Sequence, residues 1–292
     1  MNKIGILYHP LVHATHEKAG NLREYLESRG IAAWLCSAWD IKRARARLDG
    51  TDLLLTVGGD GTILRAAQVS IPEAVPITGI NFGKLGFMTE LSSEAAEAGL
   101  SRLLAGEGWL DERAMRAATV TLEGQELTYH ALNDVVAARG SIARVIYIAA
   151  IIDGQPLTTY RADGVVVATA TGSTGYSLAA GGPVLYPNAR DFILAPLMPH
   201  LSLPHPLVLP ESAVVELRVT SVHQATLSID GHINSPLPGG AVITVRHSPH
   251  KVRFLRLRNP NSFYASLEAR LKGRNEGRQS PDPGYRPDTP SG

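Results

Sequence analysis

The sequence predicts an α/β N-terminal domain with a Rossmann-like parallel sheet, followed by an all-β, β-sandwich-like C-terminal domain. Short apolar runs alternate with segments of helical spacing up to about residue 80, and this alternation is typical of parallel sheets. From about residue 116 apolar runs follow one another without helical segments between them, which indicates β-structure. Helical spacing returns at residues 261–271, where we expect one C-terminal helix.

The N-terminal part repeats a strand followed by a helix. Residues 2–8 read as a strand, and the apolar positions of residues 14–29 recur at helical spacing until Gly30 ends the helix. The unit repeats with strands at residues 31–36, 52–57 and 76–80, and with helices at residues 41–48 and from Thr62. Ligands of such sheets bind beyond the carboxyl ends of the strands.

The C-terminal part contains eight expected strands, at residues 117–122, 126–138, 142–152, 165–169, 213–219, 225–229, 241–245 and 251–257. The last residues of the chain are rich in Pro, Gly, Arg and Ser, a composition that does not bury a core. We therefore divide the chain into an α/β domain (residues 1–115), a β-rich domain (116–258), a C-terminal helix (259–272) and a disordered tail (273–292).

Composition excludes several classes of protein. The 292 residues are 44% hydrophobic and 19% charged, with a net charge of +1, so bulk electrostatics favour neither a nucleic-acid nor a membrane-surface partner. The single cysteine, Cys36, excludes an intramolecular disulfide. Residues 1–10 carry no signal peptide and no apolar stretch approaches the roughly 20 residues of a membrane helix, so we expect a cytoplasmic protein.

Asp60 occupies the most informative position in the chain. It lies in the turn Gly58-Gly59-Asp60-Gly61-Thr62, directly after an apolar strand and before a helix. Glycines allow close approach of the backbone to a ligand, and the free N–H groups of a helix N-terminus attract anions. A carboxylate alone is a poor phosphate binder, so we expect Asp60 to accept a proton from a hydroxyl that attacks phosphorus.

A second dense motif runs from Thr169 to Pro183 and is rich in hydroxyls and glycines. It can offer amides and side-chain oxygens to a ligand, with Tyr176 available for stacking. A plain loop between strands has the same composition, and the segment alone does not distinguish the two.

Asn133 and Asp134 interrupt an otherwise apolar strand. Burial of an unpaired carboxylate would cost several kcal/mol. From this pair alone we favour a solvated strand end or bulge; the alternative is a ligand with paired hydroxyls, such as a ribose, that supplies hydrogen-bond partners.

Three further sets of polar residues allow more than one interpretation. Arg161 and Asp163 precede a strand beside the Ser/Thr/Gly segment, and that position favours a role in binding over a structural turn. Lys84 is not a phosphate-loop lysine because the Walker spacing is absent. His9, His13 and His16 span a strand end, a proline and a helix start, so we assign no metal ligand to them.

Taken together, the motifs resemble the NAD kinase family. The motifs are Gly58 to Thr62, Leu85-Gly86-Phe87, Asn133-Asp134, the segment from Thr171 to Pro183, and Asp230-Gly231. The first motif is shared with diacylglycerol and sphingosine kinases, and the later ones point to NAD. The resemblance extends from Lys3 to about Leu271.

The resemblance implies phosphorylation of the 2′-hydroxyl of the adenosine ribose of NAD by ATP, with Asp60 as the general base. It also implies a divalent cation such as Mg²⁺, held mainly by the ATP phosphates, a homodimer or homotetramer, and a C-terminal helix that returns to the first domain. The implied NAD- and ATP-binding residues are Gly58, Gly59, Asp60, Gly61, Thr62, Arg65, Phe87, Asn133, Asp134, Arg144, Arg161, Asp163, Thr171, Ser173, Thr174, Gly175, Tyr176, Ser177, Leu178 and Ala179.

Four positions depart from the usual family pattern. Ala170 stands where the family commonly has Pro, Gly175 where Ala is common, Asp134 where Glu is frequent, and His232 where Gln is more usual. The first two make the loop more flexible and Asp134 is one methylene shorter, so these differences bear on affinity rather than on the reaction.

Two other functions are compatible with parts of the sequence. A lipid kinase would share the turn around Asp60, but the chain has no amphipathic membrane-docking segment and its Ser/Thr/Gly segment suits a polar nucleotide. A catalytically silent NAD-binding regulator would keep the cleft and lose the chemistry, and the intact Asp60 argues against it.

Overall fold

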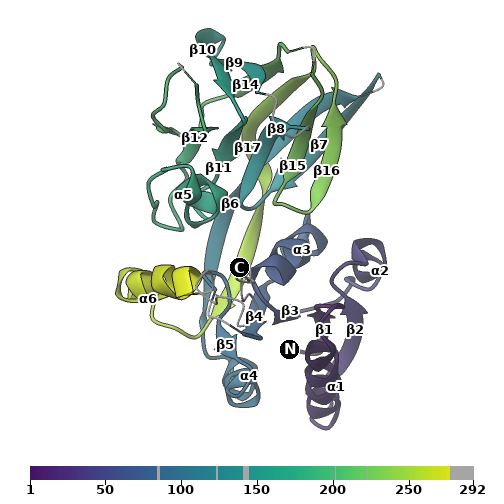
Figure 1. Ribbon diagram of the computed structural model, residues 1–292. Helices are drawn as coiled ribbons and strands as arrows, with labels where there is room; N and C mark the ends of the chain where they lie inside the picture. Colours follow the sequence, from purple (N-terminus) through teal and green to yellow (C-terminus); the bar gives the residue numbers. More distant parts are fainter. Residues whose placement is uncertain (84–85, 123, 141–144, 201, 222, 277–292) are drawn as a thin grey trace, which may run out of the picture.

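A computed structural model describes residues 1–83, 86–122, 124–140, 145–200, 202–221 and 223–276. Its N-terminal unit consists of parallel strands with helices on both faces (Figure 1). The elements of this unit are β1 (Lys3–Tyr8), α1 (His13–Glu27), β2 (Ala32–Ser37), α2 (Ile41–Arg45), β3 (Leu53–Gly58), α3 (Asp60–Ser70), β4 (Ile77–Asn81), β5 (Leu91–Ser92) and α4 (Ala96–Leu104). The strand order is β4-β3-β1-β2, so the prediction of a Rossmann-like parallel sheet is confirmed.

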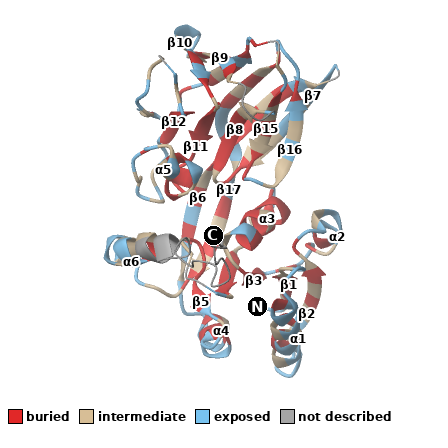
Figure 2. Ribbon diagram, in the orientation of Figure 1, coloured by how far each residue is buried: buried red, intermediate tan, exposed pale blue. Residues whose placement is uncertain are grey.

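Alternating side chains of the buried strands form two cores. Leu53 and Leu55 pack with α1 and α4 on one face of the sheet, whereas Leu54 packs with α2 and α3 on the other. All six residues of β3 are buried, as expected for a central parallel strand covered on both faces (Figure 2). The strand therefore delivers its carboxyl end, and the glycine turn after it, to a fixed position.

The β-rich half contains two sheets. Its elements are β6 (Trp109–Leu122), β7 (Gln125–Ala131), β8 (Asp134–Arg139), β9 (Ile146–Ile152), β10 (Gln155–Ala162), β11 (Gly164–Ala168), η1 (Gly172–Thr174), α5 (Tyr176–Ala179), β12 (Phe192–Leu197), β13 (Leu207–Leu209), β14 (Val215–Val219), β15 (Ala225–Ile229), β16 (Ile233–Leu237) and β17 (Val242–Arg256). The antiparallel sheet β13-β12-β11-β8-β15-β16 packs against strands β6, β9, β10, β14 and β17, with one hydrophobic core between the two layers. The prediction of an all-β, sandwich-like second half is confirmed.

Two long strands join the halves. β6 and β17 pair with each other along their whole length, and a register shift interrupts the ladder between His247 and Lys251. The upper part of β17 pairs with β14, and its lower end reaches β4 of the parallel sheet. One continuous sheet therefore runs through both halves (Figure 1), and the proposed boundary at residues 115/116 lies inside β6.

Several element boundaries differ from those expected. Residues 126–138 form two strands rather than one, and α3 begins at Asp60 rather than at Thr62. The C-terminal helix α6 (Ser262–Glu276) extends past residue 272 and lies beside the N-terminal unit. Residues 277–292, the greater part of the expected tail, lie outside the described residues. No helix in the described part of the chain is long and apolar enough to cross a membrane.

Candidate active site

The glycine turn is built by tight packing at the end of β3. A Cβ atom on Gly58 would lie 2.3 Å from the hydroxyl of Thr62, so no larger residue fits there without displacing that side chain. Gly59 is the N-cap of α3, and Asp60 is the first residue of the helix. The first N–H groups of a helix have no intrahelical partner. In α3 the Thr62 N–H donates to the Gly59 carbonyl at 3.0 Å, so the N–H groups of Asp60 and Gly61 are the ones available to bind an anion at this turn.

The Asp60 carboxylate is held by the backbone of a second loop. The Phe87 N–H donates to Asp60 Oδ2 at 2.9 Å, and the Met88 N–H donates to Oδ1 at 3.1 Å. A Cβ atom on Gly86 would lie 2.1 Å from Oδ1. Since the loop comes this close only because residue 86 is glycine, Gly86 and Phe87 of the motif belong structurally to the Asp60 turn. Leu85 lies outside the described residues.

A cleft of about 450 Å³ opens beside the turn. Arg65 lies on one wall, where its guanidinium stacks 4.0 Å from the ring centroid of Trp39, and burial lowers the pKa of Arg65. His232 lines the same cleft, and its pKa is lowered by burial, an effect to which Arg65 adds. The residues that line the cleft are His9, Val12, Thr15, Trp39, Gly58, Gly59, Gly61, Thr62, Arg65, Phe82, Asp230, Gly231 and His232.

Asp230 joins the two halves of the site. Its carboxylate accepts the N–H groups of Leu132, Asn133 and Asp134 at 2.7–3.0 Å. Asp230 takes a positive φ of 50°, and its own N–H donates to the carbonyl of Asp134. These bonds explain why the expected strand over residues 126–138 is interrupted. Where the strand breaks, the backbone N–H groups donate to Asp230 instead of to a neighbouring strand.

Asp134 lies in a neighbouring cavity of about 530 Å³ that shares Asp230 and Gly231 with the cleft. The pair Asn133-Asp134 does lie at a strand end, but Asp134 is buried rather than solvated. Burial, together with the nearby Asp230, raises the pKa of Asp134 to about 7. Burial also raises the pKa of Asp230, to about 6, but its three backbone N–H donors favour the ionised form. We therefore place the negative charge of the pair on Asp230 and the proton on Asp134.

Replacement of Asp134 with Asn should change how stability depends on pH. The pKa of a carboxyl group in an unfolded chain is about 3.9, so the folded protein binds the extra proton between about pH 4 and pH 7. Wild-type stability should therefore fall as the pH rises through this window, by an amount on the order of a few kcal/mol. The Asn variant lacks this titration. Its free energy of unfolding in urea should therefore rise relative to that of the wild type between pH 4 and about pH 8.

The exposed Asp153, whose carboxylate accepts the N–H of Val214, offers a control. Replacement of Asp153 with Asn should keep the fall in stability between about pH 4 and pH 7, because Asp134 is still present. If the Asp134 variant and the wild type show parallel pH curves, the assignment of the proton to Asp134 is wrong.

The Ser/Thr/Gly segment folds into η1 and α5 directly against Asn133. A Cβ atom on Gly172 would lie 2.1 Å from the Asn133 carbonyl oxygen. The Ser173 hydroxyl donates to the Ala170 carbonyl and accepts the Leu185 N–H, so it has a structural role. Tyr176 is 51% exposed and lines the cavity that contains Asp134. Ser177 Oγ is buried without a hydrogen-bond partner among the described residues.

Not all residues expected in the site come together. Arg161 is exposed on β10 and lines neither cavity. Asp163 pairs with Arg139 at 3.3 Å, and it is Arg139 that lines the cavity of Asp134. Arg144 lies outside the described residues. Leu178 and Ala179 belong to α5 but line neither cavity.

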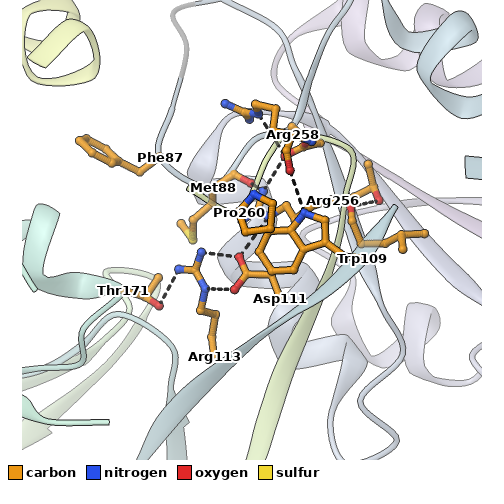
Figure 3. A network of polar contacts seen from close by, with 12 residues as sticks. Phe87, Met88, Trp109, Asp111, Arg113, Thr171, Arg256, Arg258 and Pro260 are labelled. Atoms are coloured by element: carbon orange, nitrogen blue, oxygen red, sulfur yellow. Dashed lines mark hydrogen bonds and ion pairs between the residues drawn. The ribbon is translucent and has the colours of Figure 1, made fainter. Parts of the chain in front are cut away.

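Phe87, Thr171 and Thr174 line a third, smaller cavity of about 70 Å³. A network of buried ion pairs lines this cavity (Figure 3). Arg113 bonds both carboxylate oxygens of Asp111 and reaches the Thr171 hydroxyl at 3.3 Å. Burial raises the pKa of Asp111, but Arg113 and Arg256 more than offset this effect and hold it below its usual range.

Sequence reasoning did not find several residues that line these cavities, among them His9, Trp39, Arg139, Thr226, Ser228 and Asn234. The first two follow β1 and β2, whose carboxyl ends meet at the same edge of the sheet as that of β3. The rule that ligands bind beyond this edge could have found them. The others lie on antiparallel strands, where no local signal marks the face that turns toward the cavity.

The metal ion implied by the resemblance is compatible with this set of residues as a phosphate-bound ion. Within the described ranges, no three His, Cys, Asp or Glu side chains are grouped to hold a metal. Mg²⁺ commonly uses one or two carboxylates together with substrate phosphates and water. A cation carried mainly by phosphates at the glycine turn is therefore compatible with the site.

The fold and the site define the class of protein. A carboxylate at a glycine-rich helix N-terminus, next to a cleft suited to phosphate groups, is the arrangement of a phosphotransferase. The ATP-NAD kinase N-terminal domain family matches residues 10–108, and the ATP-NAD kinase C-terminal domain family matches residues 132–257. The chain belongs to the ATP-NAD kinase family.

Curated relatives agree over nearly the whole chain. An NAD kinase of Dehalococcoides mccartyi is 50% identical over 94% of this chain and 97% of its own length. An NAD kinase of Chloroflexus aggregans is 40% identical over 93% of this chain and 99% of its own. The resemblance inferred from the motifs is therefore confirmed.

Two solved structures have the same fold. An NAD kinase from Archaeoglobus fulgidus, in complex with ATP, superposes with a TM-score of 0.75 at 26% identity and covers 93% of this chain and 99% of its own. Yeast NADH kinase, complexed with NADH, gives a TM-score of 0.80 at 24% identity, covering 98% of this chain and 90% of its own. The second similarity is evidence of the fold alone.

Proposed function

We propose that this protein transfers the γ-phosphoryl group of ATP to the 2′-hydroxyl of the adenosine ribose of NAD, giving NADP and ADP. The observation that supports this proposal is the position of Asp60, a carboxylate fixed at the N-terminus of α3 in the turn whose Gly58, Gly59, Gly61 and Thr62 line the cleft. The cavity of Asp134 shares Asp230 and Gly231 with that cleft. The two connected cavities would allow a dinucleotide to extend from the glycine turn to the strand end at Asn133.

In the proposed step, the 2′-oxygen of the ribose attacks the γ-phosphorus while Asp60 accepts the hydroxyl proton, and the bond to the β-phosphate oxygen of ADP breaks. Each oxygen of Asp60 accepts one backbone N–H. A carboxylate oxygen has two lone pairs, so each oxygen keeps an acceptor direction for the hydroxyl. Arg65 and the N–H groups of α3 would stabilise the phosphates. A bound Mg²⁺ would neutralise phosphate charge.

Binding of NAD is assigned to the second cavity. The residues proposed there are Asn133, Asp134 and Tyr176, which line it, together with the segment around Thr174 and Gly175 that packs against Asn133. A protonated Asp134 would donate a hydrogen bond to a ribose oxygen or an adenine nitrogen. The homodimeric or homotetrameric state and the cytoplasmic location expected from the sequence stay predictions.

One assay tests the proposal. The protein is incubated with Mg²⁺ and ATP and with NAD, NADH or a diacylglycerol, and NADP is detected with a dehydrogenase specific for it. Polyphosphate replaces ATP in a parallel series. NADP formation from NAD and ATP is the expected result. Turnover of the lipid without NADP formation would overturn the proposal.

A further inference from the structure

The loop from Gly86 to Thr89 is hydrogen-bonded on both sides. Its N–H groups at Phe87 and Met88 point to Asp60. Its carbonyl groups point the opposite way and accept hydrogen bonds from arginines. Arg270 Nη1 donates to the carbonyls of both Gly86 and Phe87, each at 2.8 Å.

These bonds link Arg270 to Asp60 through two peptide groups. The Gly86 carbonyl and the Phe87 N–H belong to one peptide unit, and the Phe87 carbonyl and the Met88 N–H belong to the next. A cation on the carbonyl side polarises the peptide and strengthens the N–H donor on the other side. One guanidinium therefore acts on both N–H groups that fix the Asp60 carboxylate.

Two further arginines anchor the rest of the loop. Arg256 Nη1 donates to the Met88 carbonyl at 2.6 Å, and Arg258 donates to the Thr89 carbonyl. Both guanidinium groups also contact Glu90, whose other oxygen accepts the N–H groups of Leu257 and Arg258. Arg256 and Arg258 thereby tie the loop to the end of β17 (Figure 3).

Arg270 differs from these two arginines because it comes from α6 and forms no ion pair among the described residues. Its side chain is buried, and burial lowers its pKa to about 10, an effect to which Arg258 and Arg256 add and which Asp60 and Glu90 oppose. The guanidinium therefore stays charged at neutral pH. The Asp60 carboxylate is one of the two anionic groups that compensate it.

We infer that Arg270 is a positioning residue for Asp60: the C-terminal helix places a guanidinium that orients the carboxylate through the peptide groups of residues 86–88. The inference rests on the proposed function, in which Asp60 accepts the ribose proton. It assigns α6 a part in the reaction, although the helix contributes no group to either cavity that contains the glycine turn or Asp134.

The test compares Arg270→Met and Arg270→Lys with wild type. Loss of the guanidinium should lower kcat about 10- to 100-fold, because small misplacements of a reacting group cost rates of this size, while KM for NAD changes less than threefold. Lys retains the charge and should restore part of kcat.

A double variant separates positioning from general loss of structure. If Arg270 acts only through Asp60, Asp60→Asn/Arg270→Met should have the same residual turnover as Asp60→Asn. A further drop of tenfold or more in the double variant would overturn the inference. Arg102→Met, which removes an exposed arginine paired with Glu107, is the matched control and should keep wild-type kcat and KM for NAD.

The two hypotheses fail in different ways. If Asp60→Asn keeps near wild-type turnover, the proposed base is wrong and the inference fails with it. If Asp60→Asn is inactive but the Arg270 variants keep wild-type kcat and KM for NAD, only the inference fails. Should Arg270→Met not fold, Arg270→Lys decides by the same two readouts.

Discussion

Asp60→Asn is expected to lower kcat for NADP formation by about 10²- to 10⁴-fold, the usual cost of losing a general base. The amide of Asn has the shape of the carboxylate but cannot accept the ribose proton. Its nitrogen would also face the N–H of either Phe87 or Met88, which now donate to the two carboxylate oxygens. We therefore expect some local rearrangement of the loop.

Binding and turnover should separate in this variant. The affinity for NAD, measured by calorimetry, should stay within severalfold of wild type because the cavity of Asp134 is built from other elements. Asp52→Asn is a matched control, since Asp52 also accepts two backbone N–H groups, from Asn2 and Lys3, at the opposite end of β3. The control should keep wild-type kcat; near wild-type turnover in Asp60→Asn itself would refute the base.

Local sequence patterns were sufficient to predict the Asp60 turn. The apolar run of β3, the glycines after it and the helix that follows lie next to one another in the chain. Each signal depends only on neighbouring residues, so the parallel sheet and the edge that carries the site followed from the sequence.

Features that depend on distant pairing were not predictable in this way. The break at Asn133 is made by the carboxylate of Asp230, almost one hundred residues away along the chain. The joining of both halves into one sheet depends on the register of β6 with β17. Arg270 lies on a helix whose sequence contains no pattern that would single it out; its contact with the Asp60 loop follows from the docking of α6.

Gly172→Ala is expected to destabilise the protein and to impair NAD binding together. The added Cβ would lie 2.1 Å from the carbonyl oxygen of Asn133 and 2.6 Å from its carbonyl carbon. Both partners are backbone, so the clash is not relieved by rotating a side chain. Overpacking of this kind costs about 1–3 kcal/mol. We therefore expect the free energy of unfolding, measured in urea, to fall by about 1–3 kcal/mol or more.

The affinity for NAD should fall because the shift separates Asn133 from η1 and from α5, whose Tyr176 lines the cavity of Asp134 together with Asn133. Gly20→Ala is the matched control: nothing lies within 4 Å of its added Cβ in the middle of α1. Ala is favoured over Gly inside a helix by about 0.5–1 kcal/mol, so the control should raise stability and leave NAD binding unchanged. If the Gly172 variant keeps wild-type stability, the backbone at Asn133 accommodates the added Cβ without cost, and this prediction is wrong.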